Sequence, residues 1–308
     1  MQRIARKPFP THIFVFLLPA VIIYTLFMVY PLFDSLRLSF FDQSVQGPPI
    51  FVGLQNFQTL LGDPQWSQHF WNALGNNFVF FSIHMFVQNP LALLLATLLT
   101  VKQLRGRAIY RTLIFAPTTL SVVIIGFIWS LILSPIWGIF DGILKSIGLG
   151  GIIQPWLGSD QTALITVSLM SVWQWVGLPM VLFMAALLGI PEELIEAARV
   201  DGASPWKVFT EIKIPLLLPT IGIVGVLTFV GNFNAFDLVY ATQGLLATPN
   251  YHTDLLGTFF YRTFYGFQLQ PGNPTMGTTV AAMMFLIILV GVLIYMFGWQ
   301  RRIARIQG

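Results

Sequence analysis

Acidic side chains are the residues of this chain that could most directly take part in chemistry, and they gather in one short stretch. Residues 192–211 contain Glu192, Glu193, Glu196, Asp201 and Glu211. Such oxygen ligands could in principle hold a metal ion, but their spacing fits two short helices joined by a turn better. The chain has no Cys, no H-E-x-x-H or G-x-S-x-G motif, and no G-x-x-x-x-G-K-[ST] phosphate loop. We therefore expect no catalytic residue, no metal site and no cofactor in this chain, and an intramembrane enzyme is disfavoured.

Polar residues inside long apolar stretches form a second candidate set. They are Trp173 and Gln174 in one stretch, and Asn232, Asn234 and Asp237 near the end of a later one. Aromatic faces beside hydrogen-bonding groups suit a sugar, which has apolar C–H faces and many hydroxyls. Polar residues in hydrocarbon usually face the bundle interior, so these five are candidates for a substrate pathway. The alternative, that their side chains bond one helix to another, remains open.

A third polar set lies in an earlier apolar stretch. Asn77, His84 and Gln88 are spaced i, i+7 and i+11, which places them on one helical face. For this set we expect hydrogen bonds between helices rather than ligand contacts. A single histidine such as His84 does not make a metal site.

The elements that must position these residues are membrane-spanning helices. Of the 308 residues, 56% are hydrophobic and 9% are charged, whereas a soluble domain is about 25% charged. Six apolar stretches are long enough to cross a bilayer, at about 12–33, 74–100, 110–133, 162–190, 215–240 and 276–299. We predict an all-α membrane protein whose residues 1–308 form a single domain with six transmembrane helices.

The distribution of basic residues predicts the orientation of these helices. All but three of the 16 Lys and Arg residues fall at the two ends of the chain and in the loops that share their side. The three exceptions are Arg37, Lys145 and Arg262. Since positive charge favours the cytoplasmic side, we expect both termini in the cytoplasm of a multi-pass cell (inner) membrane protein. The basic charge is thereby accounted for without a nucleic-acid partner. On the outward side we expect a compact segment over 34–73 and a short interfacial helix over 136–147.

The cytoplasmic loop over 191–219 predicts a helical hairpin. Pro191 can start a helix whose first turn is acidic, and Asp201-Gly202 is a turn signal that ends it. Ser204 then suits an N-cap and Pro205 the first position of a second helix. Small and apolar residues are too frequent in this loop for a merely solvated turn, which suggests a docking surface.

This loop resembles the EAA loop of permease subunits of ATP-driven, binding-protein-dependent (ABC) importers. The matching residues are Glu196, Ala197, Ala198, Asp201, Gly202, Ile212 and Pro215. The sequence DGAS after the EAA triplet is similar to the sugar and glycerol-phosphate branch, and four other stretches agree, at 51–66, 110–129, 156–164 and 236–244. The chain looks most like the first of two permeases, the maltose-type F or glycerol-phosphate-type A subunit.

The resemblance implies a type I importer permease fold and a set of partners. They would be a second permease subunit, two ATPase subunits that bind ATP and Mg²⁺, an extracytoplasmic solute-binding protein and the membrane lipid. The 191–215 loop would couple this chain to the ATPase, with a sugar or oligosaccharide as cargo and glycerol phosphate or a polyol as the alternative. From a different class, an ion-coupled secondary transporter would carry more charged residues in its spans, and a channel would not need the hairpin.

Overall fold

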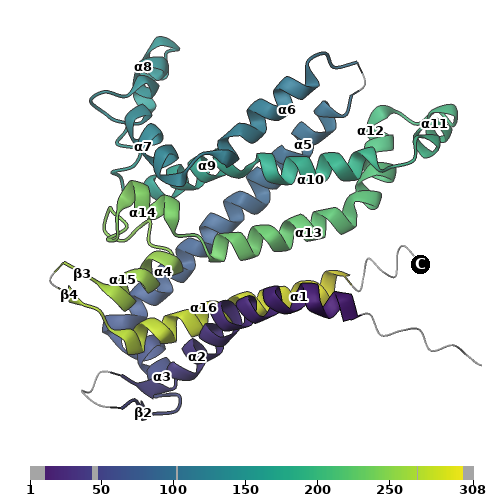
Figure 1. Cartoon of the computed structure of the whole chain (residues 1–308). Coiled ribbons are helices and arrows are strands. Elements are labelled where there is room, and N and C mark those ends of the chain that lie inside the picture. Colours follow the sequence, from purple (N-terminus) through teal and green to yellow (C-terminus); the bar gives the residue numbers. More distant parts are fainter. Residues whose placement is uncertain (1–10, 44–47, 102, 269, 301–308) are drawn as a thin grey trace, which may run out of the picture.

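Long helices run side by side along the main direction of the molecule (Figure 1). The computed structural model describes residues 11–43, 48–101, 103–268 and 270–300. Four apolar helices are long enough to cross a membrane, at Val15–Leu38, Pro64–Leu99, Pro205–Phe233 and Pro274–Trp299. Two bent pairs could each form one further span, at Arg107–Thr119 with Val122–Ile132 and at Ala163–Trp175 with Gly177–Leu188. The predicted all-α fold is confirmed.

The long helices are built from α-helical pieces joined by short π-helical turns. The first is α1 (Thr11–Tyr24), η1 (Thr25–Val29) and α2 (Tyr30–Leu38); the second is α4 (Pro64–Ile83), η2 (His84–Gln88) and α5 (Asn89–Leu99); the last is α16 (Pro274–Ile294) and η6 (Tyr295–Gln300). The bent pairs are α6 (Arg107–Phe115) and η3 (Ala116–Thr119) with α7 (Val122–Ile132), and α9 (Ala163–Trp175) with α10 (Gly177–Leu188). Between α10 and α13 (Ile214–Phe233) lie α11 (Glu192–Val200), α12 (Pro205–Val208) and the π turn η5 (Phe209–Lys213).

The second long helix begins ten residues before the predicted span of 74–100. It starts at Pro64, where the Asp63 side chain caps it by accepting a hydrogen bond from the backbone N–H of Gln65 (2.8 Å). Residues 64–73, predicted to lie in an outward segment, therefore form the first turns of this helix. The segment before it contains α3 (Gln55–Gly62) and a two-stranded pairing of β1 (Phe41–Asp42) with β2 (Ile50–Phe51) in the register Phe41↔Phe51.

The apolar stretch 110–133 is not one straight helix, because its two halves are bent by 102°. Pro117 has no N–H to donate to the preceding turn, and the hydroxyls of Thr118 and Thr119 bond to the carbonyls of Phe115 and Ala116 (2.6 and 2.8 Å). Leu120 then takes an extended conformation before α7. The predominantly apolar composition of the stretch predicted one span and did not reveal this break.

The fourth and fifth stretches also differ from single straight spans. The helix over 162–190 bends by 45° at Val176, three residues before Pro179. The fifth helix ends at Phe233 rather than at 240, because the Asn232 and Asn234 side chains bond to the carbonyls of Thr228 and Val230 (2.6 and 2.9 Å).

The end of the molecule opposite α11 carries the short elements of the fold (Figure 1). They are α8 (Ile139–Ser146), the 3₁₀ turn η4 (Gly150–Ile152), α14 (Asp237–Gln243), α15 (Leu256–Tyr265), and the antiparallel strands β3 (Gly266–Phe267) and β4 (Gln270–Pro271), paired Gly266↔Pro271. The helix predicted over 136–147 is therefore present as α8. Ile143 is exposed while Leu144 is buried, and its contact with the membrane interface stays a prediction.

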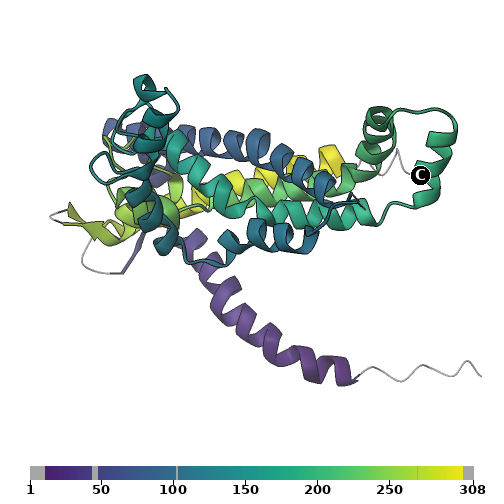
Figure 2. The ribbon, with the colours of Figure 1, turned by 90° about the horizontal axis from the view of Figure 1, so that it is seen from above.

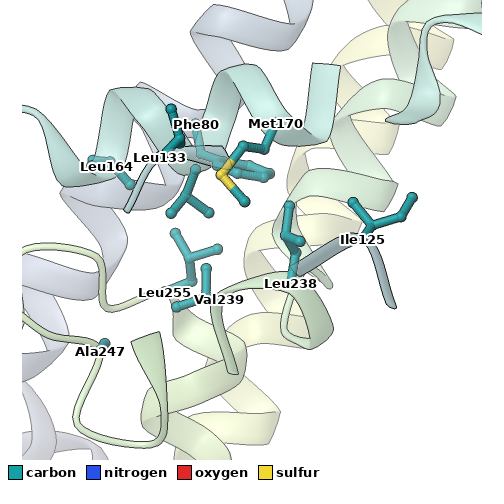
Figure 3. Packing of buried hydrophobic residues seen from close by; sticks show 10 residues of the cluster. Phe80, Ile125, Leu133, Leu164, Met170, Leu238, Val239, Ala247 and Leu255 are labelled. Atoms are coloured by element: carbon teal, nitrogen blue, oxygen red, sulfur yellow. The ribbon is translucent and has the colours of Figure 1, made fainter. Parts of the chain in front are cut away.

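Three apolar clusters hold the helices together. Figure 3 shows the one at the end that carries α14, where Phe80 of α4, Met170 of α9 and Val239 of α14 meet Leu255. A second cluster joins α5, α10 and α13, and a third joins α3, α4, α15 and α16. The first helix takes little part in these clusters: α1 leans away from the bundle (Figure 2) and its described side chains are exposed.

Candidate functional site

A cavity of about 320 Å³ lies between η2, α9, α10, α13 and α14. Most of its lining is apolar, including Phe80, Trp175 and Phe236. Its polar side chains come from four different elements and are His84, Gln88, Ser171, Thr228, Asn232, Asn234 and Asp237. A mainly apolar hollow with a few convergent polar groups is the usual form of a small-molecule site.

The break at the end of α13 brings three of the predicted pathway residues to this cavity. Asn232 is buried, and with its Nδ2 bonded to Thr228 O its Oδ1 has no hydrogen-bond partner among the described residues. Asn234 and Asp237 are exposed at the cavity wall, Asp237 as the first residue of α14. Asn234 directly follows the end of α13 and Asp237 begins α14, so both sides of the helix break contribute to one wall.

The remaining predicted pathway residues, Trp173 and Gln174, lie outside the cavity lining. Trp173 packs edge-on against Trp129 with ring centroids 5.6 Å apart. Gln174 is fully buried, and neither polar atom of its amide has a partner among the described residues. The tryptophan that does line the cavity is Trp175, which lies two residues after Trp173 and therefore on nearly the opposite face of α9. A direct role of Trp173 or Gln174 in a pathway stays a prediction.

Two of the three residues on the polar face predicted for the second span, Asn77 and His84, make the expected bonds between helices. The Oε1 of the third, Gln88, has no hydrogen-bond partner among the described residues. Asn77 donates to Asn232 O (2.9 Å) and accepts from the N–H of Leu256 (2.7 Å), which ties α4 to α13 and α15. A hydrogen bond joins His84 Nε2 to Ser171 Oγ (2.9 Å). His84 and Gln88 open and close the π turn η2, and both also line the cavity. Local widening of this kind is frequent at functional sites.

The hairpin predicted from residues 191–215 is present at the end of the molecule away from α14 (Figure 1). Helix α11 ends in a left-handed turn at Gly202, whose φ is +78°. The N–H of Gly202 bonds to Arg199 O (3.0 Å) and that of Ala203 to Ala198 O (2.9 Å), which is the Schellman arrangement. Ser204 then caps α12 by accepting from the Lys207 N–H (3.3 Å).

The hairpin presents its side chains to the outside. Glu196, Ala197 and Asp201 are exposed, and Ala198 is half-buried. Two large apolar side chains stand out, with Val200 87% and Trp206 72% exposed. An apolar side chain at a helix end that none of the described residues covers is suited to a protein contact.

The second arm of the hairpin is continuous with the fifth span, which differs from the separate short helix that was predicted. One uninterrupted helix runs from Pro205 to Phe233. Ile212 is half-buried within the π turn η5, and Pro215 follows at the start of α13. Because Pro215 cannot donate to the carbonyl four residues earlier, the wider π turn accommodates it without ending the helix.

Sequence reasoning missed a buried polar cluster, the outer cluster, formed by Asn72, Asn76, Asp254, Thr258 and Arg262. Asp254 is 0% exposed and accepts from Arg262 Nη2 and Thr258 Oγ1 (both 2.6 Å). Arg262 also donates to Leu245 O (2.6 Å). Burial raises the pKa of the Asp254 carboxyl, while the hydrogen bonds from Arg262 and Thr258 act in the opposite direction.

The outer cluster fixes the loop after α14 onto α4. Asn72 donates to Tyr251 O (2.8 Å) and Asn76 donates to Asp254 O (2.9 Å). Asp254 therefore lies beside α4, although it falls outside the six apolar stretches of the sequence. One sequence signal could have predicted the outer cluster. Asn72 and Asn76 are spaced i and i+4, so they lie on one face of a helix, and an acidic and a basic residue, Asp254 and Arg262, follow close together in a later outward segment.

The acidic residues of 192–211 do not gather into a metal site. Among the residues with described positions, no three His, Asp or Glu side chains lie close enough together to hold an ion. Lys207 and Glu211 form an exposed ion pair at 3.9 Å instead.

Comparison with known proteins decides the family. A family model for the "binding-protein-dependent transport system inner membrane component" matches residues 88–305. The chain belongs to this family. The resemblance that the sequence motifs suggested is thereby confirmed, and the chain is an inner-membrane, permease-type component of an ABC transport system.

Individual relatives agree over most of the chain. A probable ABC transporter permease protein of Bacillus subtilis, YurN, is 34% identical over 82% of this chain and 85% of its own. The lactose transport system permease protein LacF of Rhizobium radiobacter is 29% identical over 93% of both chains. A chain of a bacterial ABC transporter that imports the acidic polysaccharide alginate has the same fold, with a TM-score of 0.75, 24% identity, and coverage of 97% of this chain and 96% of that one.

Proposed function

We propose that this chain is the transmembrane permease subunit of an ATP-driven importer for a sugar or oligosaccharide, and that it moves cargo by alternating access. The observation that carries the proposal is the continuous helix Pro205–Phe233. Its first turns form one arm of the exposed hairpin and its last residues line the cavity. At 29 residues it is about 44 Å long, so a displacement of the hairpin moves a cavity wall.

The residues of the hairpin have different roles in this coupling. Gly202 provides the left-handed turn that fixes the angle between α11 and α12. Glu196 and Ala197 are exposed on α11, where they would contact a groove of an ATPase subunit. ATP and Mg²⁺ would be held by that subunit, and this chain would be non-catalytic. Closure of two ATPase subunits would then rock the spans between inward-open and outward-open states.

The partner set follows from this role. It comprises a second permease subunit, two ATPase subunits, an external solute-binding protein and the surrounding lipid. The exposed apolar side chains of α1 and η1, such as Phe16 and Phe27, must be covered by lipid or by one of these chains. The hairpin, the start of α1 and the end of η6 lie at one end of the bundle (Figure 1), and the hairpin with η5 carries Arg199, Lys207 and Lys213. That end would be cytoplasmic, and both termini with it.

The chemistry of the cavity supports a sugar as cargo. Trp175 and Phe236 offer aromatic faces, and Asn234, Asp237 and Ser171 offer hydrogen-bonding groups. The lactose permease relative, which matches nearly the whole chain, supports the same class. Glycerol phosphate or a polyol is the alternative cargo. An ion-coupled transporter has weaker support, because Asp237 is the one formally charged residue in the cavity lining.

Purification of the tagged chain from its native membrane in a mild detergent tests the assembly. We expect an ATPase subunit and a second permease to copurify, and a sugar with its binding protein to raise ATP hydrolysis by the complex. A chain that elutes alone or as a homodimer in several mild detergents would contradict the importer and favour a secondary transporter or channel.

A further inference from the structure

The charge lining the cavity is one-sided. Asp237 carries a carboxylate at the cavity wall, and none of the lining residues is Lys or Arg. The described hydrogen bonds and ion pairs include none from a cation to Asp237. Its charge is therefore not neutralised by any of the described residues.

Arg262, the first Lys or Arg residue after Asp237 in the sequence, has its charge paired elsewhere. Arg262 is 8% exposed, with its guanidinium bonded to Asp254 and to Leu245 O. Arg111 lines a different hollow, beside Phe115 and Met184. Neither contributes positive charge to the lining of the cavity.

Resting on the proposed function, we propose that Asp237 sets the charge class of the cargo: the cavity takes a neutral polyhydroxylated molecule and rejects an anionic one. A carboxylate accepts hydrogen bonds from two hydroxyls, and such bonds are stronger than those between neutral groups. The same carboxylate repels a phosphate or uronate, and apolar walls such as Trp175 and Phe236 weaken the solvent screening of that repulsion. Of the two cargo classes considered above, the neutral sugar fits and glycerol phosphate does not.

The apolar lining makes this selection by charge effective. An anion entering the cavity exchanges water for Phe80, Val239 and similar side chains, and an unpaired charge is costly to desolvate. A basic side chain would normally offset that cost, and none lines the cavity. At about 320 Å³ the cavity lies at the lower end of the range of about 300–1,000 Å³ that is typical of small-ligand sites, so the cargo cannot remain far from the carboxylate.

Three sugars of the same ring size test the proposal: glucose, glucuronate and glucosamine. Their binding to the purified complex, without the solute-binding protein, is measured by ligand-observed NMR, so the selectivity of that protein does not enter. We expect glucose to bind at least about tenfold more tightly than glucuronate, from like-charge repulsion across a partly screened site. Asp237→Asn keeps the shape, and should bring the two affinities to within about twofold because the charge is gone.

Two further variants make each outcome decisive. Asp34→Asn removes a half-buried carboxylate that pairs with Arg37 on α2 and should leave the glucose-to-glucuronate ratio unchanged. Gly231→Leu fills the cavity, because a Cβ at Gly231 meets nothing within 4 Å, and should abolish binding of all three sugars.

The outcomes separate the two proposals. If Gly231→Leu abolishes binding while Asp237→Asn leaves the ratio as it was, sugar binds in the cavity and the role of Asp237 in selecting charge is overturned. If Gly231→Leu leaves glucose binding intact, the cavity is not the sugar site, and both proposals about it fail. Glucosamine, whose ammonium group the carboxylate attracts, should bind at least as tightly as glucose, and weaker binding of glucosamine than of glucose would overturn the role of Asp237 in selecting charge.

Discussion

The hairpin and the outer cluster lie at opposite ends of the molecule and are held together in different ways: the hairpin by contacts between sequence neighbours, the outer cluster by contacts between distant segments. In the hairpin, the turn at Gly202 and the cap at Ser204 are made by neighbours in sequence, and Val200 and Trp206 remain exposed. In the outer cluster, Asp254 is fully buried, and Asn72 and Asn76 reach it and its loop from about 180 positions earlier in the chain, at separations of 179 and 178 residues.

This difference indicates that the two regions depend to different degrees on partner proteins. The outer cluster satisfies its buried charges with groups of this chain and should be stable by itself. The shape of the hairpin is fixed by hydrogen bonds between sequence neighbours. Its exposed side chains Val200 and Trp206, however, are largely uncovered by the described residues. A permease that transmits force would need both: a rigid outward body and an arm whose surface is completed by another protein. The predictions below test this contrast.

Arg262→Leu should give the largest loss of stability. It leaves the Asp254 carboxylate buried without its ion partner, and breaking one side of a buried pair costs about 3–5 kcal/mol. Thermal unfolding in detergent, followed by circular dichroism, measures the loss. Arg37→Leu is the matched control, because Arg37 is 63% exposed in its pair with Asp34 and such pairs contribute about 0–1 kcal/mol. An equal fall in unfolding temperature for the two variants would contradict the prediction that the buried ion pair contributes more stability than the exposed one.

Trp206→Ala should weaken ATPase binding while leaving the isolated chain as stable as before. Trp206 is largely exposed, so few contacts within the chain are lost, whereas a buried interface tryptophan contributes about 2 kcal/mol or more. Titration of the purified chain with its ATPase subunit measures the affinity. The control is Trp137→Ala at the opposite end, where Trp137 is 81% exposed. A normal affinity for Trp206→Ala would move the ATPase contact away from this face of the hairpin.

What the sequence could predict follows the same contrast. Helix ends, caps and the turn of the hairpin depend on nearest neighbours, so Gly202 and Ser204 could be read directly. The long apolar helices could be found as well, because their composition is uniform over about 20 residues. The 102° bend after Pro117 could not, since it depends on how Thr118 and Thr119 use their hydroxyls.

The cavity-lining residues could be predicted only where neighbouring residues in the sequence also come together at the cavity wall. Asn232, Asn234 and Asp237 lie at the break after α13, where the Asn232 and Asn234 side chains bond to carbonyls of the preceding turn. Gln174 and Trp173 looked equivalent to them in sequence, but which side of α9 faces the cavity is set by packing against other helices. The outer cluster combines residues of α4 with residues 251–262, which lie far apart in the chain. The sequence around Asp254 and Arg262 has no periodic pattern that predicts their ion pair.

Gly202→Val should uncouple the hairpin without unfolding the bundle. The φ of +78° at Gly202 costs an L-residue about 1–2 kcal/mol, most of all a β-branched one. We expect cargo-stimulated ATP hydrolysis to fall while thermal unfolding is unchanged, and Gly202→Asn to restore much of it because Asn tolerates this conformation. Gly148→Val is the control, since Gly148 has a φ of +81° and open space around it at the outward end. Full activity of Gly202→Val would remove the hairpin angle from the mechanism.

The smallest effects should come from removing one helix cap at each end. Ser204→Ala and Asp63→Ala each delete an acceptor for a backbone N–H, at 3.3 and 2.8 Å, worth about 0.5–2 kcal/mol. In the hairpin the loss should appear only as faster hydrogen exchange of α12, because that helix end can open without the rest of the bundle. At Asp63 it should lower the unfolding temperature of the whole chain, since α4 carries Phe70 and Phe80 into two apolar clusters. If both variants lowered the unfolding temperature equally, the hairpin would be part of the same cooperative unit as the outer body, and the division between a rigid body and a partner-dependent arm would fail.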